Sequence, residues 1–309
     1  MLPHKSVLLE EALEQLAIKE NGFYLDCTFG RGGHSQGILE RLGESGRLLA
    51  LDCDSQAVNS YEAKQMLKDN RFTLKQARFS GLQTAVADLG CTGSVDGILM
   101  DIGVSSPQLD TAERGFSFLK NGPLDMRMDR TSGISASDWI ASVSEQELIK
   151  VLFEFGEERF ARRIAKAIMV EREATPITTT QQLAEIISEA VPFKEKHKHP
   201  ATRSFQAIRI AVNQELNELQ LALKQAVAEL KSGGRLVVIS FHSLEDRIVK
   251  RFIRNESKGK IDYGRLPVKE ADIDRGVLNT IGKAVKASQQ EVKNNPRARS
   301  AIMRTAEKK

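Results

Sequence analysis

The sequence predicts an α/β fold in which a mostly parallel sheet is interrupted by a block of helices. Over the first hundred residues, short apolar runs alternate with helical periodicity, as in a sheet covered by helices. This alternation stops after Ile102, and helical patterns follow a loop in residues 105–204. The α/β pattern then resumes. We therefore expect residues 1–104 and 205–309 to form one domain, with residues 105–204 inserted as a second, helical domain.

Local patterns place the individual elements. Apolar runs next to glycine or polar residues predict strands at 22–27, 46–51, 72–76, 95–102, 235–241 and, at the end of the chain, 294–304. Apolar residues on one helical face predict helices at 33–42, 55–67, 205–230 and 244–254. Within the insertion, the same spacing predicts helices at 145–172, which Gly156 can divide, and at 180–191, which Pro192 ends.

Composition and charge limit the classes of protein. Hydrophobic residues make up 41% of the chain, which excludes a disordered chain. The net charge of +4 conceals a basic final quarter, residues 231–309, with nineteen basic and nine acidic residues. That excess suits either a polyanionic partner or an ordinary solvated surface.

The termini and cysteines point to the compartment. The sequence shows neither a membrane-spanning run nor a signal peptide, so no membrane partner is expected. Three cysteines without a CxxC pair argue against a disulfide framework or a structural zinc site, and we expect no metal and a cytoplasmic location.

A glycine-rich turn, Asp26 to Ser35, follows the first predicted strand and opens a helix. Glycines allow a sharp turn and close approach of a ligand to the backbone. Asp52, about twenty residues beyond Gly32 at the end of the second strand, is placed to accept hydrogen bonds from ribose hydroxyls. Alternatively, the turn is only a tight connection and the carboxylate a helix cap.

The choice of ligand depends on the third glycine position and on the charges. The dinucleotide pattern G-x-G-x-x-G fits Gly30 and Gly32, but Ser35 takes the third glycine position. Asp26, Asp52 and Asp101 would form an acidic rim, which suits a sulfonium cation better than a diphosphate. The pattern therefore favours S-adenosylmethionine over NAD.

Asp101 ends the fourth strand, beside which methyltransferase-like sheets bring the substrate to the methyl group. It is our candidate catalytic residue, as an acceptor for the N–H or proton of an amine, or else it caps the loop. The three cysteines are expected away from this loop, which argues against the covalent chemistry of methylation at carbon.

Several long motifs resemble one family, that of ribosomal RNA small subunit methyltransferase H, the 16S rRNA cytosine-N4 methyltransferases. The matching segments are 4–9, 26–35, 96–110, 114–118, 123–128, 199–206, 239–247 and 295–300. The resemblance implies a Rossmann-like class I methyltransferase sheet with an inserted helical domain. It also implies methyl transfer from S-adenosyl-L-methionine to the N4 amine of a decoding-centre cytosine in 16S rRNA, with the small ribosomal subunit as substrate.

The same resemblance places the cofactor contacts on Gly32, Gly33, His34, Asp52, Phe79, Asp101 and Gln108. Phe79 is also a candidate for ordinary core packing. The chain has Asp101-Ile102-Gly103-Val104 where many DNA amino-methyltransferases have Asp/Asn-Pro-Pro-Tyr/Phe, and a backbone carbonyl at this place can still align the amine.

Contacts with RNA require cations and aromatic side chains. Candidates for phosphate contacts are Arg114, Arg203, Arg209, Arg247, Arg297 and Arg299, and His242 is a further candidate for binding RNA. Candidates for packing on a cytosine that leaves its stack are Phe116, Phe118, Trp139 and His242. The cluster 197–200 is expected to be an RNA-facing loop.

Three other functions remain open. They are a ribosome assembly factor that binds the cofactor without turnover, a methyltransferase acting on another nucleic acid or a small molecule, and an NAD-linked oxidoreductase. The sequence leaves monomer and homodimer open.

Overall fold

The computed structural model describes residues 6–192, 199–258 and 275–309. The chain divides into two compact units, Met1–Gly103 with Leu216–Lys309, and Val104–Glu215. The second boundary therefore lies at 215/216, and the expected boundary at 204/205 is wrong. The helix α11 (Ala201–Asn213) packs in the helical unit against α8 (Glu145–Gly156), so closely that a Cβ on Gly156 would lie 2.9 Å from the Arg203 carbonyl oxygen.

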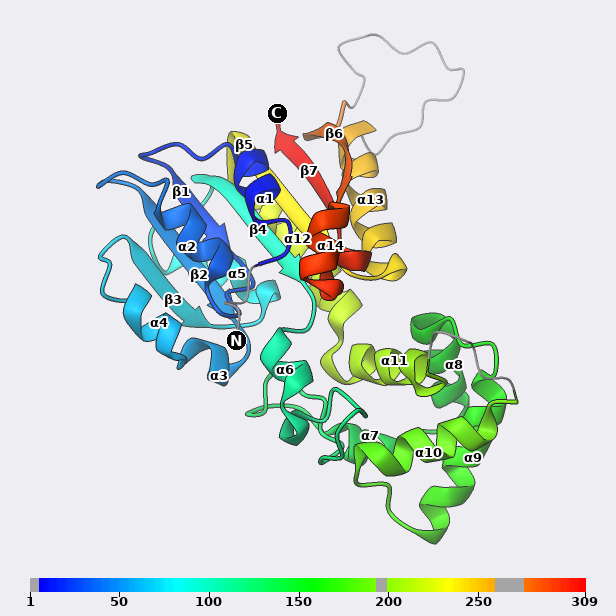
Figure 1. The fold of residues 1–309 in the computed structure, drawn as a ribbon. Helices are drawn as coiled ribbons and strands as arrows, with labels where there is room; N and C mark the ends of the chain where they lie inside the picture. The colour runs from blue at the N-terminus through cyan, green and yellow to red at the C-terminus, as the bar shows by residue number, and fades with distance from the viewer. Residues whose placement is uncertain (1–5, 193–198, 259–274) are drawn as a thin grey trace, which may run out of the picture. The chain divides into compact units, whose positions relative to one another are not determined.

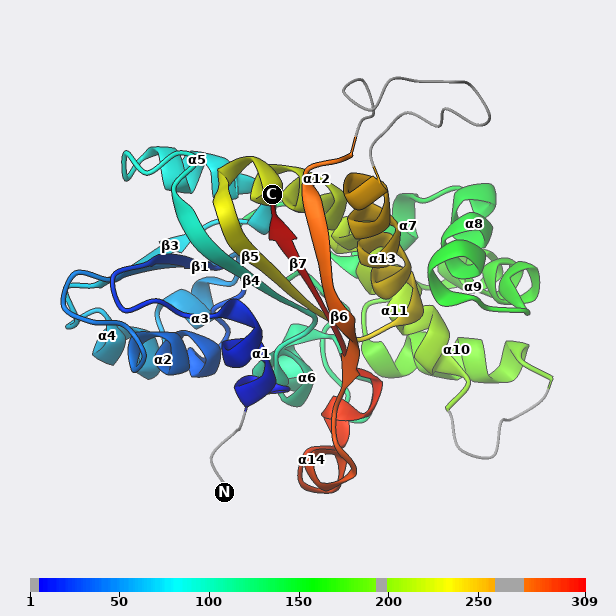
Figure 2. The same ribbon diagram turned by 90° about the horizontal axis from the view of Figure 1, so that it is seen from above.

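The first unit contains a seven-stranded sheet in the order β3-β2-β1-β4-β5-β7-β6. Its strands are β1 (Phe23–Asp26), β2 (Arg47–Asp52), β3 (Phe72–Gln76), β4 (Val95–Ile102), β5 (Leu230–Ser240), β6 (Leu278–Lys286) and β7 (Ile302–Lys308). Strands β1 to β5 pair in parallel, and β7 runs antiparallel between β5 and β6 (Figures 1 and 2). The expected α/β, Rossmann-like sheet is confirmed.

The end of the chain differs from the prediction. The strand expected at 294–304 begins only at Ile302, because a 3-10 helix at Pro296–Ser300 occupies its first half. The sequence pattern also missed β6, whose residues are mostly exposed because it is the edge strand, so no apolar run marks it.

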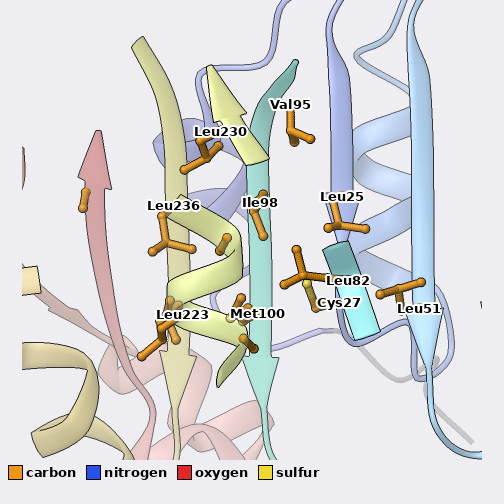
Figure 3. Close-up of a cluster of buried hydrophobic side chains, with 14 of the residues drawn as sticks. Leu25, Cys27, Leu51, Leu82, Val95, Ile98, Met100, Leu223, Leu230 and Leu236 are labelled. Atoms are coloured by element: carbon orange, nitrogen blue, oxygen red, sulfur yellow. The ribbon is translucent and has the colours of Figure 1, made fainter. Parts of the chain in front are cut away.

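One face of the sheet is covered by α5 (Leu82–Ala87), α12 (Glu215–Glu229) and α13 (Ser243–Lys258), as Figure 2 shows. Alternate strand residues point to this face, since successive side chains of a strand point to opposite sides. Figure 3 shows Leu25, Ile98 and Leu236 packed with Leu82 and Leu223 in this buried cluster.

The opposite face is covered by α1 (Leu9–Leu16), α2 (Gly33–Leu39), α3 (Ser55–Val58) and α4 (Tyr61–Met66). The helix expected at 55–67 is thus two helices, because Ser60 caps a new start at Tyr61. Tyr24, Leu48 and Leu99 pack beneath these helices. Asp26, Asp52 and Asp101 have the same strand parity as these residues and belong to this face.

The helical unit contains α6 (Ser106–Asp110), α7 (Ala136–Ser142), α8 (Glu145–Gly156), α9 (Ala161–Ala174), α10 (Thr180–Ala190) and α11. It has its own buried core, with Leu148, Ile164 and Ile187 among its members. The helix expected at 145–172 divides at Gly156, as that residue allowed. The helix expected at 205–230 is wrong as one element: it divides at Gln214, which has a left-handed backbone with φ 54°.

No helix in the described ranges has both the length and the hydropathy needed to cross a membrane.

Candidate functional site

Three neighbouring strands place a carboxylate at or next to their carboxyl ends. Asp26 and Asp52 are the last residues of β1 and β2, and Asp101 is the penultimate residue of β4. In the register, Asp26 pairs with Ala50 of β2 and with Leu99 of β4. Asp52 and Asp101 therefore lie two residues further along, on either side of the turn that follows β1. This edge of the sheet is the candidate site.

Asp26 stabilises the glycine-rich turn. Its Oδ1 accepts a hydrogen bond from the Thr28 backbone N–H at 3.0 Å, and its Oδ2 accepts one from the Ser35 hydroxyl at 2.6 Å. The residue is fully buried. The expectation that Asp26 belongs to a ligand-facing rim is therefore wrong, and Ser35, in the third glycine position, holds this carboxylate.

The glycines of the turn are required by both backbone conformation and space. Gly32 has φ +76°, and a Cβ there would lie 2.8 Å from the Met66 Sδ and 2.9 Å from the Phe29 ring. Gly33 begins α2, where a Cβ would overlap the Ser6 hydroxyl at 2.1 Å. A larger residue would overlap these side chains and, at Gly32, strain the backbone that a ligand at this edge would approach.

Asp52 is joined to both flanking loops. Its Oδ2 accepts from the Gly30 backbone N–H at 2.7 Å, and its Oδ1 accepts from the Asp54 backbone N–H at 2.8 Å. Burial raises the pKa of Asp52 to about 6, although these two bonds oppose the shift. Because each carboxylate oxygen can accept two hydrogen bonds, both oxygens retain capacity for a ligand hydroxyl.

Asp101 on β4 faces His34, the second residue of α2. Its Oδ2 lies 3.6 Å from the His34 Nδ1, while the His34 Nε2 lies 3.1 Å from the Val7 carbonyl oxygen. Because a carbonyl oxygen can only accept, Nε2 carries the hydrogen. The Asp101 backbone N–H donates to the Thr28 Oγ1 at 2.8 Å, which ties β4 to the glycine-rich turn.

The other oxygen of Asp101, Oδ1, is buried and has no hydrogen-bond partner among the described residues. Burial raises the pKa of Asp101 to about 6; His34 lowers it, and the charges of Asp26 and Glu245 raise it. A buried acceptor without a donor is costly, and a ligand N–H would satisfy it.

Glu245 is a buried residue of this unit that the sequence patterns did not single out as a site residue. It is buried in the first turn of α13, where its Oε2 accepts from the backbone N–H groups of Phe241 and His242 at 2.8 and 3.2 Å. Its Oε1 lies 3.0 Å from the His242 Nε2. A sequence signal existed: a glutamate three residues after a helix N-cap commonly reaches back to that backbone. His242 is therefore oriented by Glu245.

Comparison with known proteins decides the family. The model of the MraW methylase family matches residues 1–309. The chain belongs to the MraW methylase family. It is 58% identical to ribosomal RNA small subunit methyltransferase H of Alteromonas mediterranea over 99% of this chain and 97% of the relative. The identity is 57% to the protein of that name from Methylococcus capsulatus, over 98% of this chain and 99% of the relative.

In this MraW family member, the remaining cofactor candidates fall in different units. Phe79 lies in the first unit, in a short 3-10 helix after β3, half-buried against the core cluster of Figure 3. Gln108 lies in the helical unit, where its Oε1 accepts from the Ser105 backbone N–H at 2.9 Å and completes a capping box. Gly32, Gly33, His34, Asp52 and Asp101 are brought together at the sheet edge.

Two of the arginine candidates have guanidinium groups that bind other residues of the helical unit. Arg114 is 1% exposed, donates to the carbonyl oxygens of Arg127 and Met128 at 3.0 Å each, and lies over the Phe116 ring. Arg209 forms a bidentate pair with Glu215 at 2.8 Å per bond. Burial of Arg114 and the pairing of Arg209 with Glu215 direct these two guanidinium groups toward the protein, so phosphate contact is not supported for them by this structure.

The other cations differ in exposure. Arg247, Arg297 and Arg299 are exposed on the first unit, whereas Arg203 is half-buried on α11. Among the aromatic candidates, Phe116 is buried, Trp139 packs against the helical core, and Phe118 contacts the His199 ring at 4.5 Å between centroids. His197 and Lys198 of the expected RNA-facing loop lie outside the described residues.

Cys27 is the cysteine that pairs with the fourth strand. Its backbone N–H donates to the Leu99 carbonyl oxygen at 2.9 Å, inside the strand and before the loop that follows it. Its thiol is buried in the cluster on the opposite face, and burial, then the charge of Asp26, raises the pKa of that thiol. Such a thiol is poorly suited to act as a nucleophile.

Proposed function

We propose that this chain transfers a methyl group from S-adenosyl-L-methionine to the N4 amine of a decoding-centre cytosine in 16S rRNA of the small ribosomal subunit. Family membership and relatives named for small subunit rRNA methylation support the reaction class and the RNA. The observation that carries the amine chemistry is the buried Oδ1 of Asp101 near the end of β4, an acceptor for which the described part of the chain offers no donor.

The sheet edge fits the cofactor in charge and in space. Asp52 would accept hydrogen bonds from the ribose hydroxyls, and Gly32 and Gly33 would admit the ligand against the backbone. The carboxylate of Asp101, held near His34, would complement a cationic ligand. Phe79 would flank the adenine, and Gln108 is proposed as a further contact. When bound, S-adenosylmethionine supplies a methyl group on an electron-poor sulfur.

The catalytic task is to orient a weak nucleophile. The lone pair of a cytosine N4 is delocalised into the ring, so an acceptor for its N–H must localise that pair and aim it. Asp101 is proposed to accept this N–H, and Thr28 holds the Asp101 backbone at 2.8 Å. No covalent enzyme intermediate is required, in agreement with the buried, protonated thiol of Cys27.

Contacts with the RNA are proposed for the exposed cations Arg247, Arg297 and Arg299, together with Arg203 and His242. Arg114 and Arg209 are not proposed to contact the RNA, because their guanidinium groups bind other groups of the protein.

Methylation of purified subunits tests this function. Protein, labelled S-adenosylmethionine and small subunits from a strain lacking the enzyme are incubated, and the digested RNA is examined by mass spectrometry. We expect N4-methylcytidine. Label on carbon 5 would contradict the assigned chemistry. Cofactor binding without any label in RNA would favour an assembly factor, and label only in DNA or in a small molecule would identify a different methyltransferase.

A further inference from the structure

Four cations gather at the start of α9. Arg159 lies in the turn before the helix, and Arg162, Arg163 and Lys166 follow within it. Lys166 is four residues beyond Arg162 and three beyond Arg163, so these three side chains lie on one side of the helix, and Arg159 precedes them in the chain. All four residues are exposed, whereas Ile164 and Ala165 between them are buried. We call these four residues the α9 basic stripe.

The α9 basic stripe opposes the stability of its own helix. The amino end of a helix carries partial positive charge, so cations there are unfavourable, and the first turn of α9 contains no acidic residue. Like charges three or four residues apart also repel each other by about 0.2–0.5 kcal/mol per pair. Such a stripe is therefore poorly explained by the needs of the fold.

Within the described residues, none of the four cations has an ion-pair partner. Other arginines of the same unit differ: Arg127 pairs with Asp125 at 2.7 Å, and Arg172 donates to the carbonyl oxygens of Ile140 and Val143 at 2.7 Å each. The charges of the stripe are left for an external anion.

The stripe also borders a groove between α9 and α10. Arg163 and Lys166 line it together with apolar side chains such as Val170 and Ile186 and with two carboxylates, Glu171 and Glu189, and its volume is about 370 Å³. Val170 is 58% exposed. Cations beside a recess with apolar walls suit a strand whose phosphates are charged and whose bases are flat and partly apolar.

We propose that the α9 basic stripe binds the sugar–phosphate backbone of a single-stranded segment of the substrate RNA. The proposal rests on the proposed function for its source of RNA. Three of the four cations are arginines, whose planar guanidinium groups bind phosphate oxygens in pairs. Four cations that have no ion-pair partner among the described residues complement a polyanion, and an acidic protein segment is the alternative that the experiment separates.

The experiment compares the wild-type protein with the double variant Arg162→Gln, Arg163→Gln. Glutamine has nearly the helix propensity of arginine, so the variant is expected to fold, and urea unfolding checks this. Binding to purified small ribosomal subunits is measured between about 50 and 200 mM salt. Lys150→Gln combined with Lys224→Gln removes the same charge from two exposed positions outside the stripe and serves as the control.

We expect the variant to bind subunits about ten-fold more weakly or worse at the low end of this range. The slope of log affinity against log salt should become shallower by about 1.4–1.8, because two fewer counterions are released. The control should match the wild type.

Three outcomes contradict the proposal. Affinity and slope equal to the wild type exclude a role for the stripe. Weaker binding with an unchanged slope indicates a protein partner instead of RNA. A wild-type protein that neither binds nor methylates subunits refutes the proposed function as well, whereas active wild type with an unaffected variant refutes this inference alone.

Discussion

At the residue scale, two carboxylates of the site differ from ordinary surface acids. Asp52 and Asp101 each have a pKa raised from 3.8 to about 6, with burial as the largest cause. Both are ionised at neutral pH although burial disfavours their charge. A cationic or hydrogen-donating ligand would offset part of the free-energy cost of burying these charges. The two carboxylates therefore lower the stability of the free protein and favour ligand binding.

Replacing Asp52 by alanine should weaken cofactor binding by about 10–150-fold, because hydrogen bonds to a charged acceptor contribute about 1.5–3 kcal/mol. Calorimetry with S-adenosylmethionine measures the change. Asp52→Asn, which keeps an oxygen acceptor for the Gly30 N–H, separates the effect on the ligand from the effect on the turn. Equal affinities for all three proteins would rule out the ribose assignment.

Replacing Asp101 by asparagine should make the fold more stable at pH 8. Between about pH 4 and 6, folded Asp101 holds a proton that the unfolded chain has released, so wild-type stability falls as pH rises through this window. The variant has no carboxyl group to ionise, so its free energy of unfolding at pH 8 should exceed that of the wild type by on the order of 2 kcal/mol. Its methylation activity should fall.

Urea unfolding at pH 4 and pH 8 measures this difference, with the exposed Glu44→Gln as the control. A variant that is less stable than the wild type at pH 8 would show that the ionised form of Asp101 is favoured by the fold.

At the element scale, the turn between β1 and α2 connects the carboxylates. Asp26 holds its two ends through Thr28 and Ser35, and Asp52 holds its middle through Gly30. The Asp101 backbone joins it through Thr28. Displacement of this one turn is therefore expected to disturb three strands together.

Gly32→Ala tests this connection against Gly90→Ala. Both glycines have positive φ, +76° and +68°, but a Cβ on Gly90 meets nothing within 4 Å. Gly90→Ala should cost about 1–2 kcal/mol in unfolding free energy from the backbone alone. Gly32→Ala should cost about 2–4 kcal/mol, because its Cβ also overlaps Met66 and Phe29.

Only Gly32→Ala should also weaken S-adenosylmethionine binding, measured by calorimetry beside the urea unfolding. Equal losses of stability for the two variants, with cofactor affinity unchanged, would contradict the close packing of the turn.

At the scale of the whole molecule, the two units differ in how the chain builds them. Val104–Glu215 is continuous and encloses its own core. The sheet unit is assembled from both sides of this insertion, since β4 pairs with β5, which follows more than a hundred residues later.

Residues 104–215 expressed alone should fold, with helical circular dichroism and a cooperative thermal transition. Residues 1–103 alone should not, because the face that α12 and α13 cover and the β5 side of β4 would be exposed. A cooperative transition in the 1–103 fragment, or its absence in the 104–215 fragment, would contradict this division.

The sequence by itself determined the α/β class, the glycine-rich turn, the carboxylates at the ends of β2 and β4, and the resemblance to the family. These features are local, since periodicity and strand ends are visible in short windows. The tertiary structure alone decided that Asp26 faces inward, that Arg114 and Arg209 are engaged, that α11 belongs to the helical unit, and that the α9 basic stripe has no ion-pair partner in the described ranges. The physical reason is that the burial and pairing of a charged side chain depend on groups distant in the chain, which no local pattern records.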